Sequence, residues 1–186
     1  MSWFQEHASQ STELIKKTGV GLGAKIIDVG GGASTLVDDL LDQGYSEITV
    51  LDISGTALHR SQNRLGQRFS LVTWLELDIT RAQLSPNFYD VWHDRAVFHF
   101  LTNEGDRAEY LSAVRRSVKT GGHIIIASFG LGGPEQCSGL NVVRYSAESM
   151  HREFGRDFEL VDTTKEVHYT PVGKEQQFIY CYCRKT

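Results

Sequence analysis

The chain has 186 residues, of which 40% are hydrophobic and 23% are charged, and this matches the size and composition of one ordinary globular domain. Its 19 basic and 23 acidic side chains give a formal charge of −4, which disfavours binding to a polyphosphate backbone. The sequence has neither the pattern of a secretory signal nor an apolar run long enough to span a membrane, so we expect a single cytoplasmic domain over residues 1–186 without nucleic-acid or membrane partners.

Apolar runs and amphipathic segments alternate along most of the chain. The expected helices cover residues 8–18, 34–44, 56–66, 104–118 and about nine residues after Ser146. The expected strands cover residues 25–30, 47–54, 72–79, 88–95, 123–129, 158–164 and 176–183. Such alternation produces a parallel sheet with helices on both faces, and the last two strands form a hairpin. The sequence therefore predicts a doubly wound α/β fold with a mostly parallel, seven-stranded sheet and an antiparallel last strand.

A glycine-rich turn follows the first expected strand, which ends near Asp28. The turn contains Gly30, Gly31 and Gly32, with Ser34 two residues further on. Glycines let the backbone turn sharply and approach a ligand, and the free amides of the following helix favour an acidic ligand group. Asp52 ends the second expected strand, where a carboxylate is placed to accept both hydroxyls of a ribose. Together these features indicate a ligand that contains adenosine.

The spacing of the glycines distinguishes between adenosine-containing ligands. A dinucleotide-binding turn has the pattern G-x-G-x-x-G, but counting from Gly30 the third glycine position is occupied by Thr35. The pattern present is acidic–x–G–x–G–x–small, from Asp28 to Ser34. It resembles the first motif of class I S-adenosylmethionine-dependent methyltransferases, and the resemblance implies S-adenosyl-L-methionine as the cofactor.

Further motifs of this family follow in the same order along the chain. Asp52 and Ile53 resemble its ribose-binding acidic loop, whose second residue packs under the adenine ring, and Asp78 resembles the aspartate that accepts a hydrogen bond from the adenine amino group. Residues 89–95 resemble the fourth-strand motif, and residues 118–123 resemble the turn before the fifth strand. The resemblance implies that the cofactor is bound by Asp28, Gly30, Gly31, Gly32, Ser34, Asp52, Ile53, Asp78, Ile79, Asp94 and Arg95.

The methyl acceptor must be inferred from other parts of the chain. The fourth strand is not followed by the Asp/Asn-Pro-Pro-aromatic motif of enzymes that methylate adenine N6 or glutamine, and there is no Pro-Cys pair for an adduct to cytosine C5. We therefore expect a small-molecule acceptor. The alternative is a protein side chain. Asp94-Arg95-Ala96 is partly similar to the Asp-Lys-Gly that follows the fourth strand in methyltransferase-like enzymes that modify protein lysines. A non-catalytic nucleotide-binding domain is a third hypothesis, and a dehydrogenase, which conflicts with the missing glycine, is a fourth.

Several side chains are candidates for catalysis or for contact with the acceptor. Arg95 is a candidate to pair with the cofactor's carboxylate, with an anionic substrate or with a neighbouring aspartate. His99 is a candidate general base, with a packed core histidine as the other interpretation. The candidate substrate contacts, which could equally be packing residues, are Trp3, Phe4, Arg144 and Tyr145.

The cysteines of the chain do not have the spacing of a metal site. Cys181 and Cys183 form a Cys-x-Cys pair, which is not the spacing of a zinc knuckle, and Cys137 stands alone in the glycine-rich loop after the fifth strand. We interpret all three as buried thiols in a reducing compartment and expect no metal ion. A role for Cys137 in binding a thiol or metalloid stays open. We expect a monomer or a weak homodimer.

Overall fold

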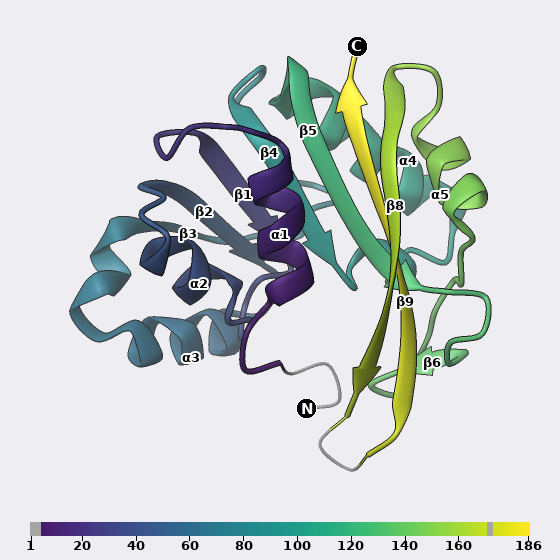
Figure 1. The fold of residues 1–186 in the computed structure, drawn as a ribbon, viewed down its shortest axis with the longest axis horizontal. Coiled ribbons are helices and arrows are strands. Elements are labelled where there is room, and N and C mark those ends of the chain that lie inside the picture. The colour runs from purple at the N-terminus through teal and green to yellow at the C-terminus, as the bar shows by residue number, and fades with distance from the viewer. Residues whose placement is uncertain (1–4, 171–172) are drawn as a thin grey trace.

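The computed structural model describes residues 5–170 and 173–186. Seven strands form one sheet in the order β3-β2-β1-β4-β5-β9-β8 (Figure 1). Their bounds are Lys25–Val29 for β1, Glu47–Asp52 for β2, Val72–Glu76 for β3, Tyr89–Arg95 for β4, Val118–Phe129 for β5, Phe158–Tyr169 for β8 and Glu175–Lys185 for β9. The pairs among β1 to β5 are parallel, and β9 runs antiparallel to both β5 and β8. This arrangement confirms the predicted fold class.

Helices cover both faces of the sheet, as Figure 1 shows for α1 in front of it and α4 behind it. The helices are α1 (Ser9–Lys17), α2 (Leu36–Asp42), α3 (Gly55–Leu65), α4 (Glu104–Ser117) and α5 (Ala147–Phe154). One apolar core packs α1, α2 and α3 against the strands, and a second core packs α4 and α5 against the opposite face. Burial of both sheet faces explains why the central strands are continuous apolar runs.

The phase of each strand decides which core its side chains enter. Ile26 of β1 and Val91 of β4 belong to the core under α1 to α3, whereas Ile27 and Trp92 belong to the core under α4 and α5. Successive side chains of a strand point to opposite faces, so the residues that end β1 and β4 are divided between the two faces in the same way. This division determines which polar residues can reach a common site.

The structure contains several short elements that the sequence patterns did not predict. They are two 3-10 helices, η1 (Gly66–Leu71) and η2 (Phe98–Phe100), and two short paired strands, β6 (Gln136–Cys137) and β7 (Leu140–Asn141). Ser138 and Gly139 connect β6 to β7 and both have positive φ, at 51° and 81°. Two such residues form the tight turn that best fits the twist of a hairpin. This β6–β7 hairpin lies inside the glycine-rich loop that follows the fifth strand.

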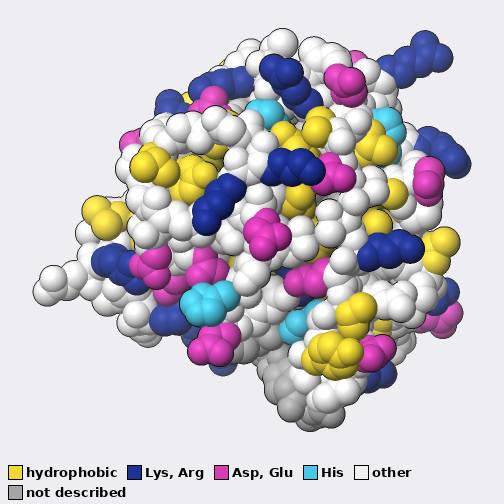
Figure 2. Space-filling view, in the orientation of Figure 1, with side chains coloured by type: hydrophobic (Ala, Val, Ile, Leu, Met, Phe, Trp, Pro, Cys, Tyr) yellow, Lys and Arg dark blue, Asp and Glu magenta, His cyan; other side chains and the backbone are white. Residues whose placement is uncertain are grey.

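The surface that α1 crosses carries charges of both signs. In Figure 2, Lys and Arg side chains are interspersed with Asp and Glu side chains over this face. The described residues in that view therefore do not form one continuous basic surface, in line with the formal charge of −4. Within the described part of the chain, every helix is too short or too polar to cross a bilayer.

Candidate active site

A cavity of about 490 Å³ opens at the carboxyl ends of β1, β2 and β4. The order of the strands along the sheet reverses at β1, which lies between β2 and β4. Ligands of open α/β sheets bind at this switch point, because the loops that leave the two neighbouring strands diverge there. Every residue predicted to bind the cofactor lines the cavity except Gly32 and Asp94.

The glycine turn after β1 forms one wall of the cavity. Its first residue, Gly30, has φ of +74° and donates its backbone N–H to the carbonyl of Leu51 at 2.7 Å. A Cβ at Gly30 would overlap the side chain of Val97. A Cβ at Gly32 would overlap the carboxylate of Asp52 and lie 2.6 Å from the Cβ of Ala57. Gly32 thus lets the turn lie close to the Asp52 side chain and to Ala57 of α3, although it does not line the cavity.

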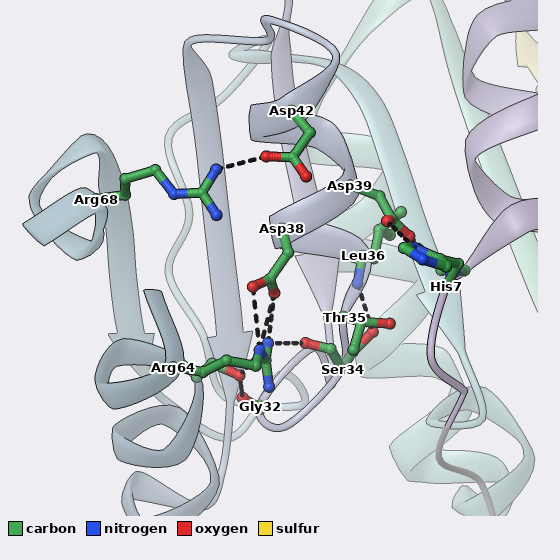
Figure 3. Close-up of polar contacts among 12 residues, drawn as sticks. His7, Gly32, Ser34, Thr35, Leu36, Asp38, Asp39, Asp42, Arg64 and Arg68 are labelled. Atoms are coloured by element: carbon green, nitrogen blue, oxygen red, sulfur yellow. Dashed lines mark hydrogen bonds and ion pairs between the residues drawn. The ribbon is translucent and has the colours of Figure 1, made fainter. Parts of the chain in front are cut away.

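Polar side chains of α2 and α3 hold this turn from its outer side (Figure 3). The Ser61 hydroxyl donates to the Gly32 carbonyl at 2.6 Å, and Arg64 Nη2 donates to the Ser34 carbonyl at 2.6 Å. Asp38 accepts from Arg64 Nε at 3.1 Å and from Nη2 at 2.6 Å, so the guanidinium itself is fixed. These bonds occupy carbonyls that a sharp turn leaves without backbone partners, and they keep the amides of the turn in place.

Asp52, at the end of β2, is anchored through both of its carboxylate oxygens. Oδ1 accepts the backbone N–H of Ser54 at 2.8 Å, and Oδ2 accepts that of Gly32 at 2.9 Å. Burial raises the pKa of this carboxyl, and the hydrogen bonds from Ser54 and Gly32 act in the opposite direction. Each carboxylate oxygen can accept more than one hydrogen bond, so an anchored Asp52 can still accept from a pair of ligand hydroxyls.

The next part of the cavity is apolar, with one carboxylate at its edge. Ile53 is 71% exposed and Leu77 is 41% exposed, which is unusual for large apolar side chains that line a cavity. Asp78 accepts from the Thr80 hydroxyl at 2.7 Å and from the Thr80 N–H at 2.9 Å, and the hydroxyl is the main reason that the pKa of Asp78 is lowered. The arrangement can bind a flat ring with an amino group at its edge.

Asp28 of β1 and His93 of β4 form the floor of the cavity. They are directly opposite each other in the parallel register, and His93 Nδ1 lies 2.7 Å from Asp28 Oδ1. His93 Nε2 lies 2.9 Å from the hydroxyl of Ser11, on α1. The second oxygen of Asp28, Oδ2, is buried without a hydrogen-bond partner in the structure.

Arg95, at the end of β4, connects the cavity to the β8–β9 hairpin. Its Nε donates to the hydroxyl of Tyr180 at 3.2 Å, its Nη2 lies 3.5 Å from Glu166, and its guanidinium carbon lies 4.2 Å from the ring centre of Phe178. Glu166 also accepts from the side chain of Gln5 at 2.7 Å. Burial raises the pKa of Tyr180 to about 12, so this hydroxyl stays protonated and donates to Glu166. Arg95 is therefore an oriented cation with a carboxylate beside it.

The far side of the cavity is formed by two segments outside the predicted cofactor-binding residues, one of which is the glycine-rich loop that contains the candidate Cys137. Phe100 and Leu101 follow β4, and Cys137, Ser138 and Leu140 belong to the β6–β7 hairpin. Burial raises the pKa of the Cys137 thiol, so the thiol is protonated near neutral pH. In the sequence, the Ser-Gly pair at the tip of this hairpin is the feature from which the hairpin could have been predicted.

The structure places Asp94 and His99 away from the cavity. Asp94 faces α4 and accepts hydrogen bonds from the amides of Val97 and Phe98 and from the Tyr110 hydroxyl, at 2.8, 3.0 and 2.6 Å. It therefore holds the backbone after β4 rather than lining the cavity. His99 is fully buried between aromatic rings, and burial lowers its pKa to about 3. A histidine that is neutral and enclosed in this way does not meet the geometric requirement for a general base.

The candidate substrate contacts lie elsewhere as well. Arg144 donates to the carbonyls of Leu131 and Gly133 and to Glu135, so it braces its own loop. Tyr145 is buried in the core under α4 and α5, with its ring centre 5.5 Å from that of Phe98. Trp3 and Phe4 lie outside the described residues. We therefore keep only Arg95 among the candidates for catalysis or substrate contact whose positions are described.

Comparisons with known proteins identify the family of the chain. The family model for a methyltransferase domain matches residues 27–124, a little over half of the chain. The eEF1A lysine and N-terminal methyltransferase of Danio rerio is 29% identical over 104 residues, which are 54% of this chain and 15% of that protein. The chain thus spans about a sixth of the length of the curated relatives it matches.

Solved structures give the same result for the fold. A SAM-dependent methyltransferase from Methanosarcina mazei has a TM-score of 0.75 at 13% identity, over 92% of this chain and 96% of that one. The 1,6-didemethyltoxoflavin-N1-methyltransferase of Burkholderia thailandensis, solved with S-adenosylhomocysteine, has a TM-score of 0.72 at 18% identity, over 96% of this chain and 77% of that one. The family match confirms the predicted family: the chain belongs to the methyltransferase domain family and has the fold of S-adenosylmethionine-dependent methyltransferases.

Proposed function

We propose that this chain transfers a methyl group from S-adenosylmethionine to a small-molecule acceptor. The observation that carries the proposal is one cavity with two different linings. One part has the turn after β1 and the carboxylates of Asp28, Asp52 and Asp78, and the other has the apolar side chains of Phe100, Leu101 and Leu140 beside Arg95. Pockets for small molecules combine an apolar lining with a few fixed polar groups in this way.

The residues of the first part fit the cofactor. The buried Oδ2 of Asp28 has no partner in the structure, and an ammonium group is the kind of donor that such an oxygen requires. Asp52 is anchored by two amides and keeps capacity for the ribose hydroxyls. Ile53 offers an exposed apolar surface to the adenine ring.

The reaction needs orientation more than it needs acid–base chemistry from the protein. Bound S-adenosylmethionine supplies an electrophilic methyl group on a positively charged sulfur, which the lone pair of an acceptor takes in one displacement that leaves S-adenosylhomocysteine. The carboxylates and the turn fix one reactant, while the β6–β7 hairpin and Arg95 fix the other. Holding two reactants in a reactive geometry can lower a barrier by roughly 7–11 kcal/mol.

A protein side chain is the second candidate acceptor. The sequence similarity to the eEF1A lysine and N-terminal methyltransferase of Danio rerio favours it. Leu140, which lines the cavity, is 61% exposed, and Leu131 in the same loop is 64% exposed. These two side chains would offer apolar contacts to a polypeptide that approaches the cavity.

The two candidates are distinguished by where label from the cofactor goes. The chain would be incubated with methyl-labelled S-adenosylmethionine and a cell lysate, which is then divided by a size filter. A labelled small molecule that is distinct from unreacted S-adenosylmethionine, and that is absent with an Asp52→Ala variant, supports the proposal. Labelled product only in the macromolecular fraction would refute it and favour the protein acceptor.

A variant pair tests whether the hairpin contacts the acceptor. Leu140→Glu places a charge in the cavity wall, whereas Leu131→Glu makes the same change at an equally exposed position of the same loop that does not line the cavity. We expect Leu140→Glu to raise KM for the acceptor without changing the Kd of S-adenosylhomocysteine, and Leu131→Glu to change neither. Equal effects of the two variants would contradict this assignment for a small-molecule acceptor and favour a polypeptide that contacts both side chains.

A further inference from the structure

The floor of the cavity contains a buried chain of polar groups that the transfer reaction does not use directly. It consists of Asp28, His93 and Ser11, which are 2%, 2% and 1% exposed. Asp28 and His93 are register partners in β1 and β4, and both point to the face that α1 covers. Ser11 reaches them from α1. Three separate segments thus meet at this point.

The hydrogen bonds define what each atom of the imidazole does. With the proton on Nδ1, His93 donates to Asp28 Oδ1 at 2.7 Å, and Nε2 accepts a hydrogen bond from the Ser11 hydroxyl at 2.9 Å. Both ring nitrogens are then satisfied, and the ring has one orientation. Because the ring is fixed, it also fixes the carboxylate that it contacts.

Fixing Oδ1 of Asp28 determines where Oδ2 points. A Cβ at Gly31 would overlap Oδ2, so this oxygen occupies the space that the glycine leaves open at the edge of the turn. Oδ2 has no hydrogen-bond partner in the structure, and both Asp28 and Gly31 line the cavity. An unpartnered carboxylate oxygen at such a place requires a donor from a ligand.

We propose that His93 is a positioning residue, which holds Asp28 so that Oδ2 binds the ammonium group of the cofactor's amino-acid portion. The inference rests on the proposed function, since it requires an S-adenosyl amino acid in the cavity. Its consequence is selectivity. Ligands with the amino-acid portion gain a charge-assisted hydrogen bond that depends on His93, and ligands with only the adenosine and the sulfur do not.

The same three residue types form the triad of many hydrolases, with the same order of hydrogen bonds. Here the serine is not placed to act as a nucleophile. Ser11 is almost completely buried in α1 and is not among the residues that line the cavity, and its hydroxyl lies 3.5 Å from that of Tyr180. The triad geometry therefore serves to orient Asp28.

Two ligands and a set of substitutions test the proposal by calorimetry. S-adenosylhomocysteine contains the amino-acid portion, and 5′-methylthioadenosine lacks it. His93→Gln removes the donor that faces Asp28. His93→Asn introduces an amide nitrogen that can occupy the position of Nδ1 and donate to Asp28. Asp28→Asn replaces the carboxylate itself by a neutral amide of equal size. Trp92→Phe, on the same strand but facing the other core, is the control for a general loss of packing.

We expect His93→Gln and Asp28→Asn to raise the Kd of S-adenosylhomocysteine by about ten- to a hundredfold and to leave the Kd of 5′-methylthioadenosine unchanged. His93→Asn should retain most of the affinity, and Trp92→Phe should retain all of it. The role of His93 would be overturned if the variants weakened the binding of both ligands equally, or if Asp28→Asn did not weaken the binding of S-adenosylhomocysteine. If the unaltered chain binds neither ligand, the proposed function fails instead, so the two failures are distinguishable.

Discussion

Replacement of Asp52 by alanine tests the site most directly, because this carboxylate has a structural and a binding role. Its two oxygens accept the amides of Ser54 and Gly32 at 2.8 and 2.9 Å. Leaving these amides without acceptors costs about 1–3 kcal/mol each when they are buried. The raised pKa shows that burial of the charged carboxylate is itself unfavourable, so its removal offsets part of that loss. We expect a net destabilisation of about 1–2 kcal/mol.

The effect of the same substitution on the cofactor is larger. A hydrogen bond to a charged group contributes about 1.5–3 kcal/mol, so loss of the bonds to the ribose should weaken S-adenosylhomocysteine by at least about tenfold. Calorimetry gives the Kd, and urea unfolding gives the free energy of unfolding on the same preparation. Asp42→Ala, which removes the same charge from an exposed position on α2, is the matched control.

One result would refute the reasoning. If Asp52→Ala lowers the free energy of unfolding as expected but binds S-adenosylhomocysteine as tightly as the unaltered chain, the ribose does not lie at Asp52. Weaker binding by Asp42→Ala to the same extent would show that net charge, and not position, governs the affinity.

Three further predictions concern other parts of the site. Gly30→Ala should lower the free energy of unfolding by at least about 1 kcal/mol in urea titrations, because a Cβ there overlaps Val97 and φ is +74°. Arg64→Ala should raise the Kd of S-adenosylhomocysteine about three- to tenfold in calorimetry, because the Ser34 carbonyl loses its hydrogen-bond donor. Burial raises the pKa of Asp94 from 3.8 to about 6, so the folded state retains a proton that the unfolded chain has lost between these values. This carboxyl should therefore reduce stability by on the order of 2 kcal/mol as pH rises from 4 to 6, and Asp94→Asn should remove that pH dependence in unfolding measurements.

Each of these predictions has a control or a contradicting result. Gly21→Ala introduces a Cβ into open space at an ordinary φ and should leave stability nearly unchanged. Arg68→Ala removes a similar surface ion pair, to Asp42, without touching the turn, and should not affect binding. For Asp94, an unaltered pH dependence in the asparagine variant would show that other groups produce it.

The fold class and most of the residues on the proposed cofactor side of the cavity could be predicted from the sequence alone. The apolar runs identified the strands, and the glycines with Asp28 and Asp52 marked the ends of two of them. These features could be predicted because they follow from local rules. A strand end, a turn that needs glycine and the parallel direction of neighbouring strands together bring such residues to one edge of the sheet.

The sequence does not reveal which residues at the end of β4 reach the cavity, because that depends on how the helices pack on the sheet. His93 and Asp94 are neighbours in the sequence, yet the phase of the strand sends His93 toward α1 and Asp94 toward α4. The sequence alternation predicts that they diverge, but not which helix covers which face. His99 is likewise indistinguishable from an exposed histidine until the packing of Phe129 against it is known.

The far side of the cavity depends on contacts between distant parts of the chain. Gln5 and Glu166 meet beside Arg95, although 161 residues separate them, and the β6–β7 hairpin brings Cys137 to the same cavity. Local patterns carry no information about such pairs. The free energy that joins them comes from adding β8 and β9 to the edge of the sheet and from packing the segment before α1 against them. The proposed acceptor side is therefore a product of tertiary structure, whereas the residues of the proposed cofactor side can be predicted from the sequence.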